Sequence, residues 1–501
     1  MSGIRKFVGD TVIYGLTTVI SRVLNFLLTP LFVKKFEPTV YGIFTNLYAY
    51  AALINAVLAF GMETTYFRFL QRVKPEEKEK VFNNSFIVTI FASAVFVLSM
   101  FVFAHPIATY LGGSHSDVQQ YEDYVKLFAV ILSADALAVV PFAKLRAQQR
   151  PIRYGVVKIV NILVLIFCNL LLLYWLPVME ERFPSLQGLT QGWYQPDWLG
   201  NVFISNLIAS MVTLVLLAPQ IATFKFAIDK TLIRQMIGYS FPILVANISF
   251  IINEHLDKMM FPRLVPTAEG ARDLGIYGAV AKIAVFLNLF ITAFRLGAEP
   301  FFFSYAKNEN SGKVYAKIMD YFIVAMVLVM VGLCANIEWL KYFIKGGEFQ
   351  KDIYWSGLYI VPILLLNNVL LGIYMNLSIW YKLSDQTKYG LYISSVGAMI
   401  TIVLNILFIP KFSYLGAALS TTVTYCVMVA MSYFLGQKHY PIPYDVQKNV
   451  SYIAVAVGVS AIMFYVFDKN LWLCNLLFVL MLGGVAYSER KFILSLMARR
   501  K

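Results

Sequence analysis

Charged residues are scarce in this chain of 501 residues, and acidic residues, 28 against 42 basic ones, are the scarcer kind. Charged residues make up 14% of the sequence, apolar residues make up 59%, and the mean hydropathy is +0.68. A soluble domain carries about 25% charged residues. Apolar segments long enough to cross a bilayer recur along the whole chain. The composition therefore excludes a soluble domain with a single anchor and predicts a polytopic membrane protein.

Cysteine is also rare, and the motifs of the common enzyme classes are missing. The four cysteines lie singly inside apolar runs, which favours small buried hydrophobic residues over disulfides or metal ligands. The sequence has no phosphate-binding P-loop, no His/Cys metal spacing and no nucleophile elbow. We therefore expect a protein that is not an enzyme, with no cofactor, no metal site and no ATPase domain in this chain. The cysteines are Cys168, Cys334, Cys426 and Cys474.

The excess of basic residues gives a net charge of +14, which in a soluble protein would indicate a nucleic-acid partner. In a membrane protein, Lys and Arg instead gather in the cytoplasmic loops. With the N-terminus placed in the cytoplasm, many more Lys and Arg residues fall on the cytoplasmic side than in external loops. We expect no nucleic-acid partner, and both termini in the cytoplasm.

The apolar runs predict an all-α protein with fourteen transmembrane helices. Helices are expected because an open strand cannot satisfy its backbone hydrogen bonds in lipid. The predicted spans are roughly residues 11–33, 40–61, 82–104, 124–142, 155–176, 199–219, 239–265, 275–300, 318–336, 355–379, 390–409, 414–435, 450–467 and 471–487.

The first of these spans carries an arginine at its middle. Arg22 would cost about 2.5–3.5 kcal/mol at the centre of a bilayer, so it needs a polar cavity or a partner. Helical spacing places further polar or small residues on the same face as Arg22. The face comprises Gly15, Thr18, Arg22, Asn25 and Thr29.

A gapless shift of 236 positions (258 − 22) superposes this span on the seventh. Arg22 then falls on Lys258, so an intramembrane cation recurs. Tyr41-Gly42 and the Gly-x-Glu of Gly61 and Glu63 recur as well. Internal repeats of this kind indicate duplicated structural units. The recurring residues are Tyr277-Gly278, Gly297 and Glu299.

The repeat predicts two six-helix lobes related by a pseudo-two-fold axis along the membrane normal, with a site between them. The expected lobes are residues 1–222 and 237–437. Residues 223–236 would form a cytoplasmic amphipathic linker, and residues 438–501 would hold the last two spans and a basic cytoplasmic tail.

The seventh and eighth spans carry the densest polar residues. Glu254 and Lys258 have the favourable i,i+4 order, and Asp257 lies beside them. The alternative is that this run is the outer end of the helix, with its long side chains reaching water. In the eighth span Arg295 and Glu299 share one face and could neutralise each other.

Isolated carboxylates in apolar spans are candidate proton or cation sites. Asp135 is alone in the fourth span, whereas Glu63 and Glu299 lie near cytoplasmic ends and could be interfacial. We therefore expect the cations and one amide to bind substrate and the carboxylates to couple transport to an ion. The substrate-binding candidates are Arg22, Lys258, Arg295, Lys282 and Asn25, and the ion-coupling candidates are Asp135, Glu254, Asp257, Glu63 and Glu299.

A cavity with excess cations and no catalytic group suits an anionic amphiphile, and a pyrophosphate attached to a lipid has this chemistry. Ser21-Arg22, Asp257-Lys258, Leu274–Gly278 and Pro300-Phe301 occur in this order. In these motifs the chain resembles the flippases of the multidrug/oligosaccharidyl-lipid/polysaccharide (MOP) superfamily, the Wzx-like O-antigen and polysaccharide exporters in particular.

The resemblance implies translocation of undecaprenyl-pyrophosphate-linked oligosaccharide across the bacterial inner membrane by alternating access. It also implies contact with membrane lipids, coupling to H⁺ or Na⁺, and glycan polymerase or assembly proteins as candidate partners.

Three alternatives remain. Lipid II flippases of the same superfamily usually carry a Ser-Arg-x-x-Gly motif, whereas here Ser21-Arg22 is followed by Val23, Leu24 and Asn25. Drug antiporters of the MATE type usually expose acidic cavities. A scaffold for glycan-assembly enzymes would need no charged cavity.

Overall fold

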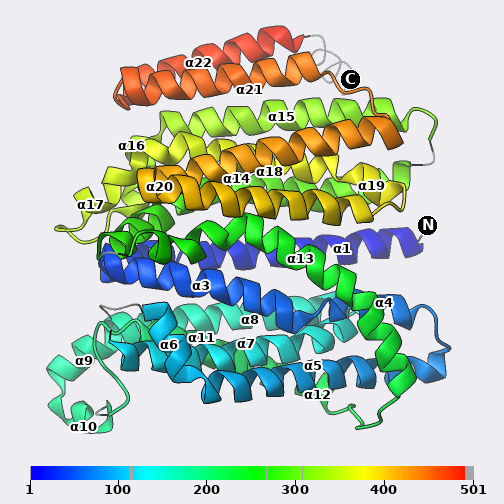
Figure 1. The fold of residues 1–501 in the computed structure, drawn as a ribbon, viewed down its shortest axis with the longest axis vertical. Coiled ribbons are helices and arrows are strands. Elements are labelled where there is room, and N and C mark those ends of the chain that lie inside the picture. The colour runs from blue at the N-terminus through cyan, green and yellow to red at the C-terminus, as the bar shows by residue number, and fades with distance from the viewer. Residues whose placement is uncertain (1, 113–116, 191, 267, 307, 491–501) are drawn as a thin grey trace. The chain divides into compact units, whose positions relative to one another are not determined.

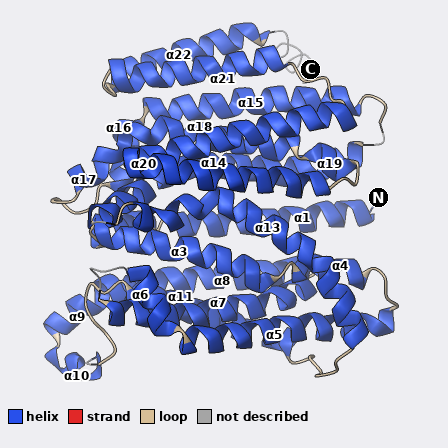
Figure 2. Ribbon diagram, viewed as in Figure 1, coloured by secondary structure: helices blue, strands red, loops and turns tan. Residues whose placement is uncertain are grey.

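The computed structural model describes residues 2–490 except 113–116, 191, 267 and 307, so the predicted tail at residues 491–501 lies outside it. Within these residues every regular element is a helix (Figure 2). In the described part of the chain, twelve helices are long and apolar enough to cross a membrane. Gly200–Leu216 is a shorter apolar helix, and the 52-residue helix Lys388–His439 contains a bend that divides it in two. These observations confirm an all-helical fold with about fourteen spans.

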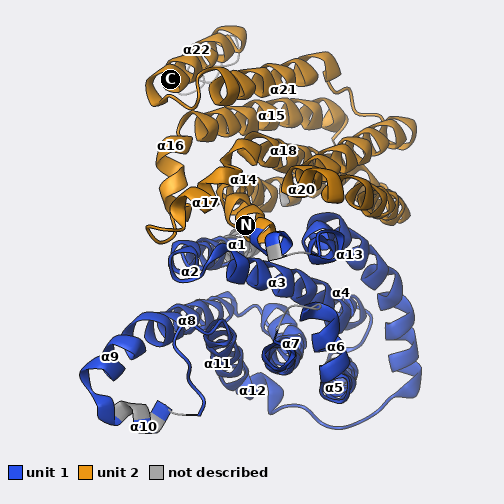
Figure 3. Cartoon of the chain, turned by 60° about the vertical axis from the view of Figure 1, so that its left-hand side comes forward, with its two compact units in different colours: residues 1–272 blue, residues 273–501 orange. Residues whose placement is uncertain are grey.

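By its internal contacts the chain divides into two compact units, residues 1–272 and 273–501 (Figure 3). The dividing point lies in the first turns of the helix α14 (Ala268–Tyr305), so the predicted seventh span belongs to unit 1 by its contacts. The predicted lobes, 1–222 and 237–437, are defined by the sequence repeat and remain a prediction.

Unit 1 is a helical bundle (Figure 1). Its longer helices are α1 (Ser2–Phe26), α2 (Thr29–Lys35), α3 (Pro38–Ala59), α4 (Met62–Leu70), α5 (Lys78–Val102), α6 (Ala104–Gly112), α7 (Val118–Ala147), α8 (Pro151–Leu170), α9 (Leu176–Arg182), α11 (Gly200–Leu216) and α13 (Lys230–Leu264). The most buried of its spans, α7, packs against α3, α5, α6 and α11. Buried Met, Tyr, Phe and Val side chains from α4, α5, α7 and α13 form one core cluster.

The first two predicted spans are each interrupted. Pro30, at the start of α2, has no backbone N–H and cannot continue the α1 ladder, so α1 ends at Phe26. Phe60 and Gly61 both have left-handed φ values, 47° and 64°, and separate α3 from α4. A Cβ on Gly61 would lie 3.0 Å from the side chain of Ile243 on α13, so the turn also needs the small residue.

The predicted linker at residues 223–236 is extended in its first part. Residues 225–229 are not helical, and the remainder forms the first turns of α13, which begins at Lys230. Asn83 and Asn84 of α5 accept hydrogen bonds from the backbone N–H groups of Lys225 and Asp229, at 3.0 and 2.8 Å. An extended segment has no helical partners for its backbone, so these two amides hold the linker against α5.

A buried lysine fixes the start of the same linker. Lys144, at the end of α7, donates to Glu79 at 2.8 Å and to the hydroxyl of Thr223 at 2.6 Å. Its ammonium also lies 3.9 Å from the centroid of the Phe82 ring. Carboxylate, hydroxyl and aromatic face together replace the water that this buried cation has lost.

Unit 2 contains two long helices and a terminal helical pair (Figure 1). The helices are α14 (Ala268–Tyr305), α15 (Ser311–Ala335), α16 (Ile337–Leu340), α17 (Lys351–Trp355), α18 (Val361–Leu377), α19 (Ile379–Leu383), α20 (Lys388–His439), α21 (Val446–Ala461) and α22 (Leu471–Ser488). Helix α18 packs against both α15 and α20. Helix α15 packs in addition against α21 and α22.

The predicted spans 390–409 and 414–435 both lie in α20, and a bend in this helix separates them. Ser413 has φ 50° and ψ −133°, three residues after Pro410. The bend brings Gly416 against the backbone of Phe408, and a Cβ there would lie 2.3 Å from the Phe408 carbonyl oxygen. Glycine is therefore required at this close approach.

Candidate functional site

Arg22 and Asn25 are exposed on one side of α1. The other side of this helix packs on α8, where Gly155 allows a close approach. A Cβ at position 155 would lie 2.9 Å from the Thr17 hydroxyl oxygen. The predicted polar face is therefore present at Arg22 and Asn25, whereas Thr29 lies beyond the helix break and is buried.

On α13, Lys258 pairs with Asp257 and not with the carboxylate of Glu254. Its ammonium lies 2.9 and 3.0 Å from the two Asp257 oxygens and donates only to the backbone oxygen of Glu254, at 3.3 Å. The expected i,i+4 ion pair is therefore wrong. Asp257 is buried and Lys258 half-buried, while the Glu254 carboxylate lies 3.9 Å from Nε2 of His255.

The backbone around Lys258 is anchored to α3. Pro262 has no N–H, so the helix itself cannot donate to the Lys258 carbonyl four residues earlier. The side-chain amide of Asn46 donates to that oxygen at 2.8 Å, and the Tyr50 hydroxyl donates to the next carbonyl, that of Met259, at 3.3 Å. The backbone at the Asp257-Lys258 pair is therefore held by the amide of Asn46, which donates in place of the N–H that Pro262 lacks.

Asp135 lies inside unit 1, where it hydrogen-bonds to a neutral group and interacts with Lys158 of α8 only at longer range. The Ser210 hydroxyl of α11 donates to its carboxylate at 2.7 Å. Nearby, Asn206 of α11 donates to the Tyr48 hydroxyl of α3 at 3.1 Å. In the described part of the chain, no cation lies within ion-pair distance of Asp135. Its partner is therefore neutral.

Glu63 and Glu299, by contrast, are each paired with a cation. Arg146, at the end of α7, binds Glu63, and Lys382 of α19 binds Glu299 at 2.7 Å. The two carboxylates and the two cations are both separated by the repeat shift (299 − 63 and 382 − 146 are each 236). Equivalent ion pairs therefore occur in both units. Glu299 does not neutralise Arg295, the alternative considered above.

A small pocket of about 30 Å³ lies beside Arg295 in unit 2. Arg295 approaches the Met375 sulfur at 3.8 Å and has no carboxylate partner among the described residues. Asn376 also lines the pocket; its Nδ2 is buried and donates to no described protein atom. The pocket is also lined by the Glu299–Lys382 ion pair, so the guanidinium of Arg295 and the unused amide donor leave it with an excess of donors that suits an anionic or strongly accepting group. Lys282 lies half-buried on the same helix, α14.

The predicted substrate-binding and ion-coupling residues are divided unequally between the two units. Unit 2 holds three of them, Lys282, Arg295 and Glu299, all on α14, and the others lie in unit 1. Arg146, Lys382 and Ser210 were not predicted as partners; the repeat shift places Arg146 on Lys382, and this recurrence of a cation was the signal that could have identified both.

The cysteines are free, and three are buried as expected. The prediction of burial is wrong for Cys426 on α20, which is exposed.

Apolar helices of membrane-spanning length throughout the described residues define a polytopic, all-helical membrane fold. Similar solved structures include a lipid II flippase, MurJ, in an inward closed conformation, with TM-score 0.74, 14% identity, and coverage of 96% of this chain and 100% of that one. A multidrug resistance MATE family transporter in an inward-facing conformation gives TM-score 0.63 at 12% identity, covering 85% and 94%. The fold is thus that of the MOP superfamily.

Residues 7–305 match the family described as polysaccharide biosynthesis protein, and the chain belongs to this family. It is also similar to the uncharacterized membrane protein MJ1068 of Methanocaldococcus jannaschii. The two are 20% identical over 487 residues, which covers 92% of this chain and 89% of that protein.

Proposed function

We propose that this protein is a flippase that moves undecaprenyl-pyrophosphate-linked oligosaccharide, the repeat unit of an O-antigen, capsule or exopolysaccharide, across the bacterial inner membrane. It does so by alternating access, with both termini in the cytoplasm. Membership of the polysaccharide biosynthesis family supports a glycan precursor as the substrate. The MOP fold supports transport rather than catalysis.

The observation that carries the proposal is the exposure of Arg22 and Asn25 on an apolar helix. An arginine facing lipid is costly, whereas one facing a polar path is available to a ligand. The guanidinium stays charged and presents a planar fork that two phosphate oxygens can bridge. Arg22 is therefore assigned to the pyrophosphate, with Asn25 beside it.

The other substrate candidates differ in their freedom to bind an anion. Lys258 is already partly neutralised by Asp257, whereas Arg295 lies beside an unused amide donor. We assign Arg295 and Lys282 on α14 to the substrate path and Lys258 to a supporting role. Among the carboxylates, Asp135 has a neutral partner and is the leading group for ion coupling, while Glu63, Glu299 and Asp257 are paired and Glu254 lies beside His255.

The test replaces Arg22 and compares transport with abundance. Arg22→Ala should insert normally but fail to move a fluorescent pyrophosphate-linked glycan across proteoliposomes, and Arg22→Lys should retain part of the rate. Arg72, exposed in the loop after α4, gives the matched control: Arg72→Ala should transport normally. Normal transport by a well-expressed Arg22→Ala protein contradicts the assignment. Loss of abundance that is restored by removing a carboxylate would show instead that Arg22 holds a structural ion pair.

Lipid II is the second candidate substrate, since the MurJ fold extends over nearly the whole chain. The same proteoliposomes distinguish the two. We expect the glycan precursor to be moved and lipid II to compete weakly, because the Ser-Arg-x-x-Gly motif is incomplete. Movement of a cationic drug would favour a MATE-like antiporter, and tolerance of Arg22→Glu would favour a scaffold.

A further inference from the structure

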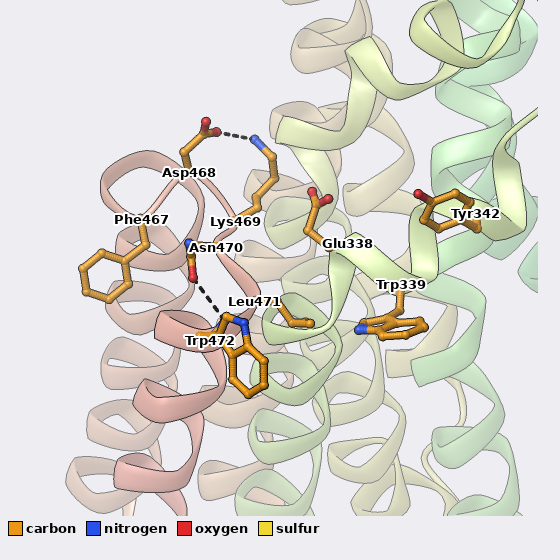
Figure 4. A pocket seen from close by; sticks show the side chains of 9 residues that line it. All are labelled: Glu338, Trp339, Tyr342, Phe467, Asp468, Lys469, Asn470, Leu471 and Trp472. Carbon is orange, nitrogen blue, oxygen red and sulfur yellow. Dashed lines mark hydrogen bonds and ion pairs between the residues drawn. The ribbon is translucent and has the colours of Figure 1, made fainter.

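A second recess lies in unit 2, away from the charged helices described above. It has a volume of about 1180 Å³ and opens between the end of α15 and the start of α22 (Figure 4). Four aromatic rings line it, one of them the half-buried Phe467, and the other three are well exposed: Trp339 by 68%, Tyr342 by 58% and Trp472 by 84%. By the distribution of Lys and Arg, both chain segments lie at the external end of the bundle.

The two walls of the recess are held in fixed relation by hydrogen bonds. Asn336, which ends α15, donates to the side-chain oxygen of Asn475 on α22 at 3.3 Å, and Asn475 donates to the Ala335 carbonyl at 3.4 Å. Gly332 lies against the ring of Phe478, where a Cβ would be 3.1 Å away. The recess is therefore preformed by the packing of α15 on α22.

A sharp turn builds the second wall. Asp468 and Lys469 both have left-handed φ values, 41° and 61°, and the side chain of Asn470 accepts from the first N–H groups of α22 at 3.1 and 3.2 Å. Lys469 lies 2.8 Å from Asp468 and holds the pKa of that carboxyl below its usual value. The turn thus contributes a carboxylate and an ammonium to the lining of the recess, and Trp472 follows at the start of α22 (Figure 4).

The charges of the recess do not suit a phosphate. Its lining contains two carboxylates, Glu338 and Asp468, each paired with one lysine, Lys341 and Lys469, so the recess carries no excess of positive charge. Anionic lipid headgroups and phosphates instead bind clusters of basic residues. Trp339 and Trp472 donate to described protein atoms only through their backbone N–H groups, so both indole N–H groups remain available. Exposed ring faces, carboxylate acceptors and N–H donors match a ligand with apolar C–H faces and many hydroxyl groups.

We propose that this recess binds a neutral oligosaccharide on the external side of the membrane, through stacking on Trp339 and Trp472 and hydroxyl bonds to Glu338 and Asp468. The identity of the oligosaccharide as the glycan part of the transported substrate rests on the proposed function; the binding itself does not. A sugar held here after translocation lies at the end of the bundle where the substrate leaves.

The test measures binding of soluble sugars to the purified full-length protein by saturation-transfer NMR and tryptophan fluorescence. The probes are tri- to pentasaccharides of glucose, galactose, rhamnose and N-acetylglucosamine, which carry no lipid and no pyrophosphate. We expect at least one to bind. Trp339→Ala and Trp472→Ala should each weaken binding by about two- to tenfold, the range of one aromatic stacking contact. Trp193→Ala, which removes an exposed indole from unit 1, should leave the affinity unchanged.

Failure of the site and failure of the proposed function give different results. Absence of binding by every probe, or equal affinity of the Trp339→Ala/Trp472→Ala double variant and the wild type, overturns the saccharide site even if glycan lipids are flipped. Loss of a co-purified phospholipid in the double variant, with saccharide binding unchanged, assigns the recess to lipid and overturns it too. Saccharide binding that depends on both tryptophans supports the site. If the same protein moves no glycan lipid, that result contradicts the proposed function and leaves the saccharide site supported.

Discussion

The side-chain amide of Asn46 donates a 2.8 Å hydrogen bond to the backbone carbonyl of Lys258, 212 residues further along the chain. The bond exists because Pro262 withholds the donor that would otherwise complete the helix at that point. The proline in α13 thus leaves one backbone carbonyl without a helical donor, and the side-chain amide in α3 donates to that carbonyl. Asp257 and Lys258 are positioned by this joint between the two helices.

Removing the amide should destabilise unit 1. Asn46→Ala leaves the Lys258 carbonyl buried without a donor, so we expect a loss of about 1–3 kcal/mol in the free energy of unfolding. Thermal unfolding in detergent measures it. In a Pro262→Ala background the helix regains its own N–H, and the cost of Asn46→Ala should become smaller. An equal cost in both backgrounds contradicts the explanation. Asn310→Ala, at an exposed position, should change stability by less than about 0.5 kcal/mol.

The ion pairs of the two units should respond alike to charge reversal. Glu63→Lys sets two cations together, and adding Arg146→Glu restores the attraction; Glu299→Lys with Lys382→Glu repeats the test in unit 2. Because these side chains are partly exposed, each pair should contribute at most about 1 kcal/mol, and less at high salt. Double-mutant cycles at low and high ionic strength measure the coupling. Zero coupling in one unit and full coupling in the other would contradict their equivalence.

Asp135→Asn should separate transport from its driving ion. Asparagine keeps an acceptor for the Ser210 hydroxyl, so stability should change little while the charge is lost. We expect glycan movement in proteoliposomes to lose its response to an imposed pH or Na⁺ gradient. Ser210→Ala serves as the control that disturbs the contact but keeps the carboxylate. Equal gradient responses in Asp135→Asn and wild type would remove Asp135 from coupling.

Asp229 gives the start of α13 a predictable acid sensitivity. The hydrogen bond from Lys80, at 2.7 Å, and those from the backbone N–H groups of Leu232 and Thr231 hold the pKa of Asp229 below its usual value. Its stabilising effect is therefore present above the unfolded pKa, about 3.9, and is lost as pH falls through the lower folded pKa.

Asp229→Asn keeps a good helix cap but removes this charge. The difference in melting temperature between wild type and variant should be present at pH 7 and vanish toward pH 3. A difference that grows on acidification would contradict the assignment.

The spans and the repeat were predictable because hydrophobic length and residue spacing are properties of the sequence itself. The ends of α1 at Pro30 and of α3 near Gly61 follow from backbone restrictions in the same way. The bend in α20 was only partly predictable from the sequence. The sequence shows a gap between two predicted spans there, but the left-handed backbone of Ser413 depends on packing.

Side-chain partners were less predictable. Lys258 has three acidic or polar neighbours within one helical turn, and sequence spacing favoured Glu254, whereas the folded helix places it on Asp257. Ser210 is 75 residues from Asp135 and is brought to it only by the packing of α11 on α7. Such contacts depend on which helix faces which, information that a single apolar sequence does not contain.

The two units each hold a carboxylate with a cation, but the cation is a different residue type in each. Where unit 1 has a guanidinium at position 146, unit 2 has an ammonium at position 382. A guanidinium can hold a carboxylate by two parallel bonds and is weakly hydrated, whereas an ammonium is a compact charge that water solvates strongly. The same rise in hydration or ionic strength should therefore weaken the Glu299–Lys382 pair before the Glu63–Arg146 pair, so the last turns of α14 should loosen from α19 before α4 loosens from α7.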